Sequence, residues 1–175
     1  MLASGSWKPD CPVAIADLRL LTLTYWGFDG AAHTGQLMVN ASVASDVLKV
    51  MERLYDARFP IRRMRLIDAY RADDDRSMAA DNTSAYNGRT VAGSDSWSMH
   101  AYGLAIDIDP LENPMVLNGK VYPPAGARFE DRSLQAKGMI HPGDVIVRAF
   151  ASIGWEWGGD WHSPKDYQHF SHSGN

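Results

Sequence analysis

Cysteine is almost absent from this sequence, because Cys11 is the only one in 175 residues. A single cysteine excludes a disulfide within the chain, and it excludes a metal site built from cysteines alone. Any metal ion that the protein binds must therefore be held by other side chains. The chain offers six histidines and 21 aspartates and glutamates for this purpose.

The sequence also lacks an excess of positive charge, a long apolar run and a visible signal peptide. Its net charge of -4 gives no electrostatic reason to expect binding to nucleic acid or to an anionic membrane. No apolar run approaches the roughly 18 residues that a transmembrane helix needs. Residues 1–12 have neither a basic start nor an apolar core. With no internal repeat, the length and the 45% hydrophobic content predict one globular domain.

Hydrophobic patterning predicts an α+β domain, with helices packed on one face of a small, mostly antiparallel sheet. One helix is expected to run from a cap at Asn40 or Ser42 to about Arg58, and a second from Pro142 to Gly154. Residues 15–26 are expected to turn from a short helix into a strand. The other expected strands and turns are a hairpin at 118–119 and strands at 36–40, 64–70, 100–109, 155–161 and 166–170.

A long polar segment, residues 71–93, separates two of the expected strands. Polar loops of this length inside a compact domain are usually functional. The segment contains the run Asp73-Asp74-Asp75, which lacks the ligand spacing of an EF-hand loop. Turn and cap roles are therefore favoured over calcium binding for these three aspartates.

The stretch from Ser98 to Asp109 carries the strongest indication of chemistry. His100 and Asp107 lie seven positions apart with Gly103 between them, and Asp107 belongs to the apolar run 104–108. Such a run is typical of a buried strand. An ionised carboxylate is costly to bury unless it is paired or binds a metal ion. We therefore expect His100 and Asp107 to hold one ion together, with Gly103 letting the chain bend between them.

A second pair of a carboxylate and a histidine lies near the C-terminus. His169 stands in an aromatic-rich segment, and Asp166 precedes it by three positions. Two histidines and one aspartate are ligands that catalytic zinc accepts, and they leave a position for a water molecule whose pKa falls to about 7. Asp166 would be the base that accepts the proton of this water. Arg89 would stabilise the developing oxyanion or hold a substrate carboxylate.

Each of these residues also has an ordinary structural explanation. A histidine and an aspartate seven positions apart are common by themselves. The tryptophans at 155, 157 and 161 are equally typical of core packing, and Asp160 follows two glycines as a turn residue would. The presence of two separate histidine–aspartate pairs is what favours a metal site.

The order Ser98-x-His100-x-x-Gly103-x-Ala105-x-Asp107, followed far downstream by Asp166-x-x-His169, resembles the zinc D-alanyl-D-alanine carboxypeptidase family. This family includes vancomycin-resistance dipeptidases and carboxypeptidases. It also includes the L-alanyl-D-glutamate endopeptidases of cell-wall turnover and phage lysis, and the resemblance therefore implies an endolysin-like protein. The resemblance runs from about Phe28 to Phe170. It implies a hedgehog/DD-peptidase-like fold, with an N-terminal arm at 1–27 and a zinc peptidase catalytic domain at 28–175.

The resemblance also implies roles for single residues. Asp166 would be the general base, and Arg89 would polarise the scissile carbonyl or bind a substrate carboxylate. The implied Zn²⁺ ligands are His100, Asp107 and His169, and the implied substrate contacts are Ser98, Asp160 and Trp161. The aspartate base and the stretch Trp-Gly-Gly-Asp-Trp at 157–161 are similar to the L-alanyl-D-glutamate endopeptidase branch. The chain departs from related sequences at Gly88, where a cysteine is expected, and this departure would leave Cys11 without a partner.

The activity that the resemblance implies is hydrolysis of peptidoglycan stem peptides outside the cytoplasm. The bond would be D-Ala-D-Ala, cut by a carboxypeptidase, or L-Ala-D-Glu, cut by an endopeptidase. A monomer is expected, with peptidoglycan peptides as partners, no nucleic acid and no membrane span. The alternative is a zinc-containing cell-wall or peptide-binding module without turnover, because the distantly related hedgehog domain shows that such a fold can serve binding.

Overall fold

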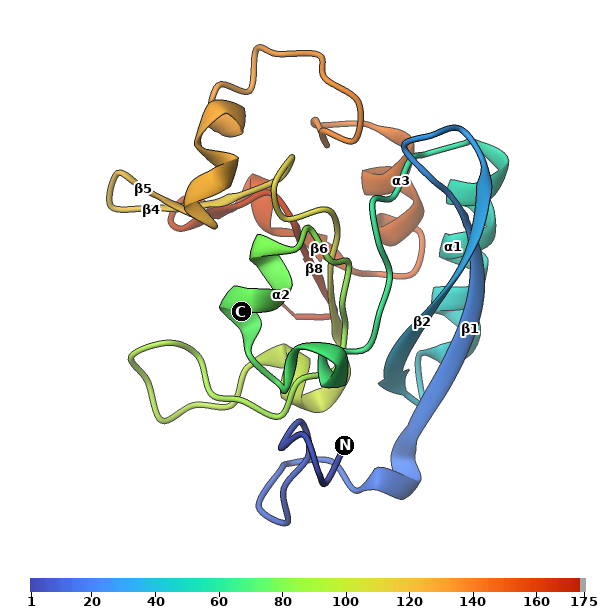
Figure 1. Ribbon diagram of the computed structural model, residues 1–175, viewed down its shortest axis with the longest axis vertical. Helices are drawn as coiled ribbons and strands as arrows, with labels where there is room; N and C mark the ends of the chain where they lie inside the picture. The colour runs from blue at the N-terminus through green and yellow to red at the C-terminus, as the bar shows by residue number, and fades with distance from the viewer. Residues whose placement is uncertain (174–175) are drawn as a thin grey trace.

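The computed structural model describes residues 1–173 as an α+β protein, which confirms the predicted fold class (Figure 1). Its strands are divided among three small antiparallel sheets, where the sequence predicted one. The first is the hairpin of β1 (Leu18–Trp26) and β2 (Ala32–Asn40). The second has the order β3 (Ala105–Asp107), β8 (His169–Ser171), β6 (Glu156–Trp157). The third has the order β5 (Lys120–Tyr122), β4 (Met115–Leu117), β7 (Lys165–Asp166).

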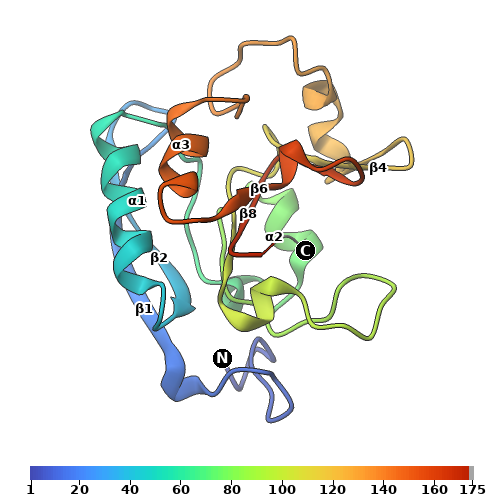
Figure 2. The same ribbon diagram turned by 180° about the vertical axis from the view of Figure 1, so that it is seen from behind.

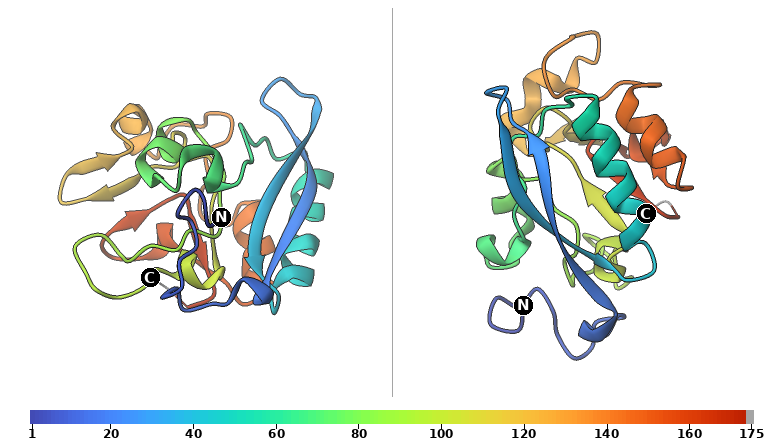
Figure 3. Two further views of the ribbon diagram at one scale, coloured as in Figure 1. Left: turned by 60° about the horizontal axis from the view of Figure 1, so that its bottom comes forward. Right: turned by 90° about the vertical axis from the view of Figure 1, so that its right-hand side faces the viewer.

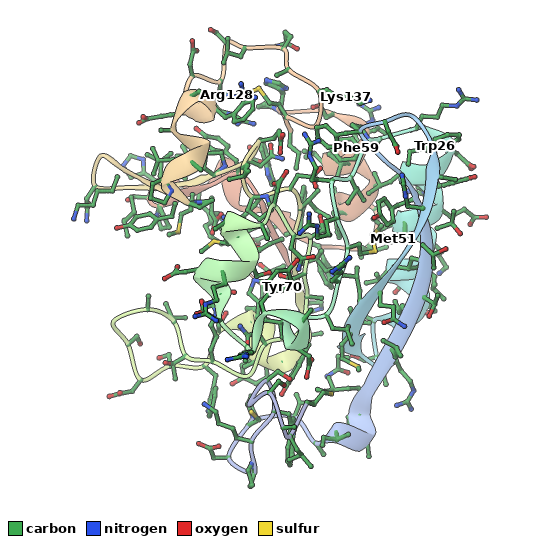
Figure 4. All side chains as sticks on the ribbon, viewed as in Figure 1. Trp26, Met51, Phe59, Tyr70, Arg128 and Lys137 are labelled. Carbon is green, nitrogen blue, oxygen red and sulfur yellow. The ribbon has the colours of Figure 1, made fainter. Side chains whose placement is uncertain are left out.

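The hairpin of β1 and β2 forms one side of the core. Leu21, Leu23 and Tyr25 of β1 are buried while the residues between them are exposed, as expected for a strand with one solvated face. Helix α1 (Ala44–Asp56) lies along this hairpin and beside α3 (Val145–Ala151) (Figure 3). It buries one apolar face, to which Met51 belongs (Figure 4).

The predicted helix at residues 42–58 is confirmed, but its predicted cap is wrong. The helix begins after Val43, and no side chain among residues 1–173 caps it. Asn40 instead accepts hydrogen bonds from the backbone nitrogen and the hydroxyl of Ser42. Asn40 also lies at the end of β2, where its side-chain amide donates to the carbonyl of Tyr102. Asn40, which local spacing predicted as the helix cap, therefore belongs to β2 and makes a long-range hydrogen bond instead.

An aromatic stack joins α3 to the central sheet. Phe150 of α3 stacks on Phe170 of β8, with ring centroids 4.2 Å apart, and also on Trp155 at 5.6 Å. Phe150 and Phe170 are fully buried. Figure 2 shows α1 and α3 on one side and β6 and β8 at the centre of the molecule. The strand that carries His169 is therefore anchored in the core.

The predicted strand at residues 64–70 is wrong. Met64 forms an isolated bridge with Thr83 and accepts a hydrogen bond from the backbone nitrogen of Gln36, and Ile67–Tyr70 form a 3-10 helix. The reason is a side chain, because Asn82 accepts from the backbone nitrogen of Arg65 at 2.9 Å and donates to its carbonyl at 3.0 Å. This amide satisfies the backbone groups that a neighbouring strand would otherwise bond.

The polar segment at residues 71–93 contains a short helix, α2 (Asp74–Ala79), which the sequence did not predict. Asp73 caps it by accepting from the backbone nitrogen of Arg76 at 3.0 Å, so the predicted cap role within the three-aspartate run is confirmed. The predicted hairpin at 118–119 is also confirmed as the β4–β5 turn, where Asn118 and Gly119 both have positive φ. Among residues 1–173, no helix is both long and apolar enough to cross a membrane.

Three buried carboxylates gather around one arginine just beyond the end of β3. Arg62 lies 3.4 Å from Asp81 and 3.3 Å from Glu112, and its backbone nitrogen donates to Asp109 at 2.9 Å. Burial and the neighbouring Asp81 raise the pKa of Asp109 well above its ordinary value. Burial, followed by the hydrogen bond with Asp81, raises the pKa of Glu112 to about 7. Burial therefore favours the protonated forms of Asp109 and Glu112 in this cluster.

Candidate metal centre

His100 lies on a 3-10 helix, Met99–Tyr102, and not on the predicted strand. Ser98 caps this helix, since its hydroxyl accepts from the backbone nitrogen of His100 at 3.3 Å. Gly103 ends it with φ +69, and a Cβ there would lie 2.6 Å from the backbone nitrogen of Asn40. The helix and the glycine turn the chain back, so that the strand β3 brings Asp107 beside His100. The predicted bend at Gly103 is therefore confirmed, while the predicted strand is limited to Ala105–Asp107.

Strand pairing places His169 opposite Asp107. In the antiparallel pair of β3 and β8, Asp107 and His169 are direct partners, and side chains of such partners lie on the same face of the sheet. His169 Nδ1 lies 2.9 Å from Asp107 Oδ1, and His100 Nε2 lies 3.2 Å from Asp107 Oδ2. The two imidazole nitrogens are 3.3 Å apart. The pairing of Asp107 with His169, 62 positions apart in the chain, thus brings the three side chains together.

The three side chains fit a zinc ion. Each offers one ligand atom, and these atoms lie within 4.8 Å of one another; no other such group occurs among residues 1–173. Tetrahedral zinc with bonds of about 2.0–2.1 Å separates its ligand atoms by about 3.3 Å, close to the spacings here. His100 Nδ1 lies 2.6 Å from the carbonyl of Ala85. A proton on Nδ1 that donates to this carbonyl leaves the Nε2 lone pair facing Asp107 and His169.

Asp107 and the two histidines shift the pKa values of this site toward its charged forms. Burial acts to raise the pKa of Asp107, but His100 and His169 outweigh it and hold this pKa well below its ordinary value. Burial likewise acts to lower the pKa of His100, and the Asp107 carboxylate raises it above its ordinary value. Asp107 is therefore ionised over the whole physiological range, as a metal ligand must be.

Asp166 on β7 lies beside this centre. Burial, the largest cause, raises its pKa to about 7, which is the range expected of a general base that works near neutral pH. Its Oδ1 is buried without a hydrogen-bond partner among residues 1–173. Gly158 lets the chain approach, because a Cβ there would lie 2.5 Å from the Asp166 carbonyl oxygen and 3.0 Å from its Cβ. The first glycine of the Trp-Gly-Gly-Asp-Trp stretch therefore makes room for Asp166.

A cleft of about 530 Å³ opens over the centre. Besides the three potential ligands, its lining includes four of the residues predicted from the sequence, namely Arg89, Ser98, Trp161 and Asp166. Trp161 packs against His169, with ring centroids 5.3 Å apart. Asp160 does not line this cleft; it lines a smaller cavity of about 210 Å³, whose wall also includes Trp161. The structure thus brings together every predicted site residue except Asp160.

Several residues of the cleft were not predicted as site residues, and Asp74 and Gln168 are the polar ones closest to its chemistry. Asp74 at the start of α2 forms an ion pair with Arg89, with 2.7 Å between Oδ2 and Nη2. Gln168 is buried, and its Oε1 has no partner among the described residues. The run Asp73-Asp74-Asp75 did mark Asp74 as unusual, but nothing local could reveal that it meets Arg89, 15 positions further along the chain.

Arg89 is held between the centre and the first residues of the chain. Its carbonyl accepts from the backbone nitrogen of Ser98, two residues before His100, at 3.1 Å. The neighbouring Gly88 donates from its backbone nitrogen to the Ser6 carbonyl at 2.8 Å. A Cβ at Gly88 would lie 2.5 Å from Cys11 Sγ. The cysteine expected at position 88 would therefore face Cys11, which is free here.

Comparison with known proteins finds one family model that matches part of the chain. Residues 92–172, which contain all three potential ligands and Asp166, match the family model described as D-alanyl-D-alanine carboxypeptidase. This match confirms the resemblance predicted from the residues and supports a peptidase. No curated protein and no solved structure gives a significant match.

Proposed function

Because residues 92–172 match the D-alanyl-D-alanine carboxypeptidase family, we propose that this protein is a zinc metallopeptidase with a hedgehog/DD-peptidase-like fold. Its substrates are peptidoglycan stem peptides, which it meets outside the cytoplasm. The observation that carries the proposal is the convergence of His100, Asp107 and His169 on one buried point below a cleft.

His100 Nε2, the Asp107 carboxylate and His169 Nδ1 are the groups that would hold the ion. When bound, Zn²⁺ polarises a peptide carbonyl and makes a water molecule acidic enough to attack near neutral pH. The hydrogen bond of His100 to the Ala85 carbonyl keeps its ring in the orientation that this role requires.

Asp166 supplies the proton transfers of the reaction. As a carboxylate it accepts a proton from the attacking water, and as the acid it returns that proton to the nitrogen of the leaving amine when the C–N bond breaks. Its pKa of about 7 suits both directions. Arg89, in the lining of the same cleft, donates hydrogen bonds to a carbonyl oxygen of the bound peptide.

The cleft suits an extended peptide with small and polar side chains. Its apolar lining includes Met115, Leu117 and Tyr122 from the β4–β5 hairpin, and its polar lining includes Ser98 and Gln168. Such a wall packs against a peptide backbone, while the few polar groups fix its orientation. Stem peptides, with their alanine, glutamate and D-residues, fit this description.

Digestion of purified peptidoglycan tests the proposal. The zinc-loaded protein should release new peptide termini, identified by mass spectrometry as free D-Ala or as an amino group on D-Glu. The first product identifies a carboxypeptidase and the second an endopeptidase. Asp166→Asn, which keeps the shape of the base and removes its function, is the matched control. Peptidoglycan left intact by the wild type, or cut equally by both proteins, would contradict the proposal.

A further inference from the structure

The ion pair between Asp74 and Arg89 has a consequence for the choice of substrate. Asp74 Oδ2 and Arg89 Nη2 lie 2.7 Å apart, and the two side chains are only 26% and 32% exposed. Both line the cleft. Water screens a partly buried ion pair less than an exposed one, so the Asp74 carboxylate balances most of the positive charge of Arg89.

The rest of the guanidinium remains available for neutral partners. Nη1 makes a long hydrogen bond of 3.3 Å to the carbonyl of Thr90. Nε is buried without a partner among the residues that the structure describes. A guanidinium has five N–H donors in a fixed plane, so the pair with Asp74 fixes this plane while leaving donors for a carbonyl oxygen.

Arg89 is the cationic side chain of the cleft that is not a potential metal ligand. Of the lining residues within 1–173, Arg89 is the only lysine or arginine, whereas Asp75 adds a second acidic side chain beside Asp74. A free terminal carboxylate that reached Arg89 would have to displace Asp74 or share the arginine with it. Placing like charges next to each other in this way is unfavourable.

We propose that Asp74 is a positioning and specificity-determining residue that makes Arg89 a receptor for an uncharged peptide carbonyl and disfavours a free terminal carboxylate. The inference rests on the proposed peptidase function. It predicts that the protein prefers substrates whose chain continues, as an amide, past the group that Arg89 contacts.

The test compares two stem peptides that differ only in a C-terminal carboxylate or a C-terminal amide. Both kcat and KM are measured for the zinc-loaded wild type, Asp74→Asn and Asp75→Asn. Asp75 is the matched control, because it lines the same cleft and carries the same charge, but Arg89 pairs with Asp74. The wild type should prefer the amide. Asp74→Asn should shift the ratio of kcat/KM toward the carboxylate by about tenfold, mostly through KM, since it frees one partly buried charge.

The control variant separates the ion pair from general charge. Asp75→Asn should shift the ratio by less than about threefold, because it acts from a greater distance through screened electrostatics. Equal shifts in the two variants, or no shift in Asp74→Asn, would overturn the role of Asp74 while leaving the peptidase function standing. A wild type that cleaves neither peptide would instead overturn the proposed function.

Binding gives a readout that does not depend on turnover. In the background of Asp166→Asn, calorimetric titration with the same two peptides should show the tenfold gain in relative affinity for the carboxylate peptide on adding Asp74→Asn. Unchanged relative affinities would refute the inference even if every variant were catalytically silent.

Discussion

Replacing Glu112 with glutamine should stabilise the protein at neutral and alkaline pH but not at acidic pH. Glu112 is 4% exposed and shares Arg62 with the buried carboxylates of Asp81 and Asp109. A glutamine has nearly the same shape, keeps an oxygen for Arg62 and offers an amide donor to Asp81. It replaces an ionisable side chain with a neutral one at a site where burial opposes ionisation.

The pKa of Glu112 sets the direction and size of this effect. Its folded-state pKa of about 7 lies above the ordinary value of 4.5. Between those two values the folded protein binds more protons than the unfolded chain, so the free energy of unfolding falls as pH rises through this window. The full difference corresponds to about 3 kcal/mol. Because Asp81 and Asp109 redistribute protons when Glu112 is replaced, we expect a gain of about 1–3 kcal/mol at pH 8 and almost none near pH 4.5.

Urea unfolding at pH 4.5, 6, 7 and 8, at constant ionic strength and zinc concentration, measures this difference. Glu52→Gln on the exposed face of α1 is the control for removing one surface charge, and its effect should stay within about 0.5 kcal/mol at every pH. A difference between Glu112→Gln and wild type that is independent of pH would refute the reasoning. So would a variant that is less stable than wild type at pH 8.

Three further predictions concern the site and its surroundings. Asp166→Asn should abolish turnover while retaining zinc, and the wild-type kcat should fall at acidic pH, because Asp166 must be ionised to act as the base and burial raises its pKa; a kcat unchanged down to pH 5 would contradict this role. Gly158→Ala should lower kcat at least tenfold with zinc content unchanged, because its Cβ would push against Asp166; wild-type kcat would show that this contact is unimportant. Gly88→Cys should form a disulfide with Cys11, detected by mass spectrometry. The Ser6 carbonyl oxygen, which would lie 2.6 Å from the new Cβ, must shift to make room for it. The loop that this disulfide closes should raise the free energy of unfolding by up to about 4 kcal/mol, and two free thiols under oxidising conditions would contradict the predicted proximity.

The site was predicted largely from short-range patterns. His100, Asp107, Asp166 and His169 stand in two compact blocks, and burial of a carboxylate in an apolar run is itself a chemical signal. What the sequence could not supply is the register between β3 and β8, which makes Asp107 and His169 direct partners. That register depends on packing of the whole chain, including the stack of Phe150 on Phe170.

The errors in the predicted fold have a common physical origin. The Asn82 side chain forms hydrogen bonds with the backbone nitrogen and carbonyl of Arg65, which a neighbouring strand would otherwise bond. The Asn40 side chain donates to the Tyr102 carbonyl and does not cap α1. In both cases a polar side chain satisfies backbone groups far away in the sequence. Asp74 escaped notice as a site residue for the same reason, since its partner Arg89 is reached only in the folded chain.

Zinc content measured by elemental analysis tests the central claim most directly. Wild type should contain about one zinc per chain, and His169→Ala should contain almost none, because losing one of three protein ligands removes most of the affinity. His172→Ala is the matched control: this histidine lies three positions from His169, is exposed and does not belong to the cluster. The control should keep the full zinc content. Stoichiometric zinc in His169→Ala, or loss of zinc in His172→Ala alone, would contradict the account.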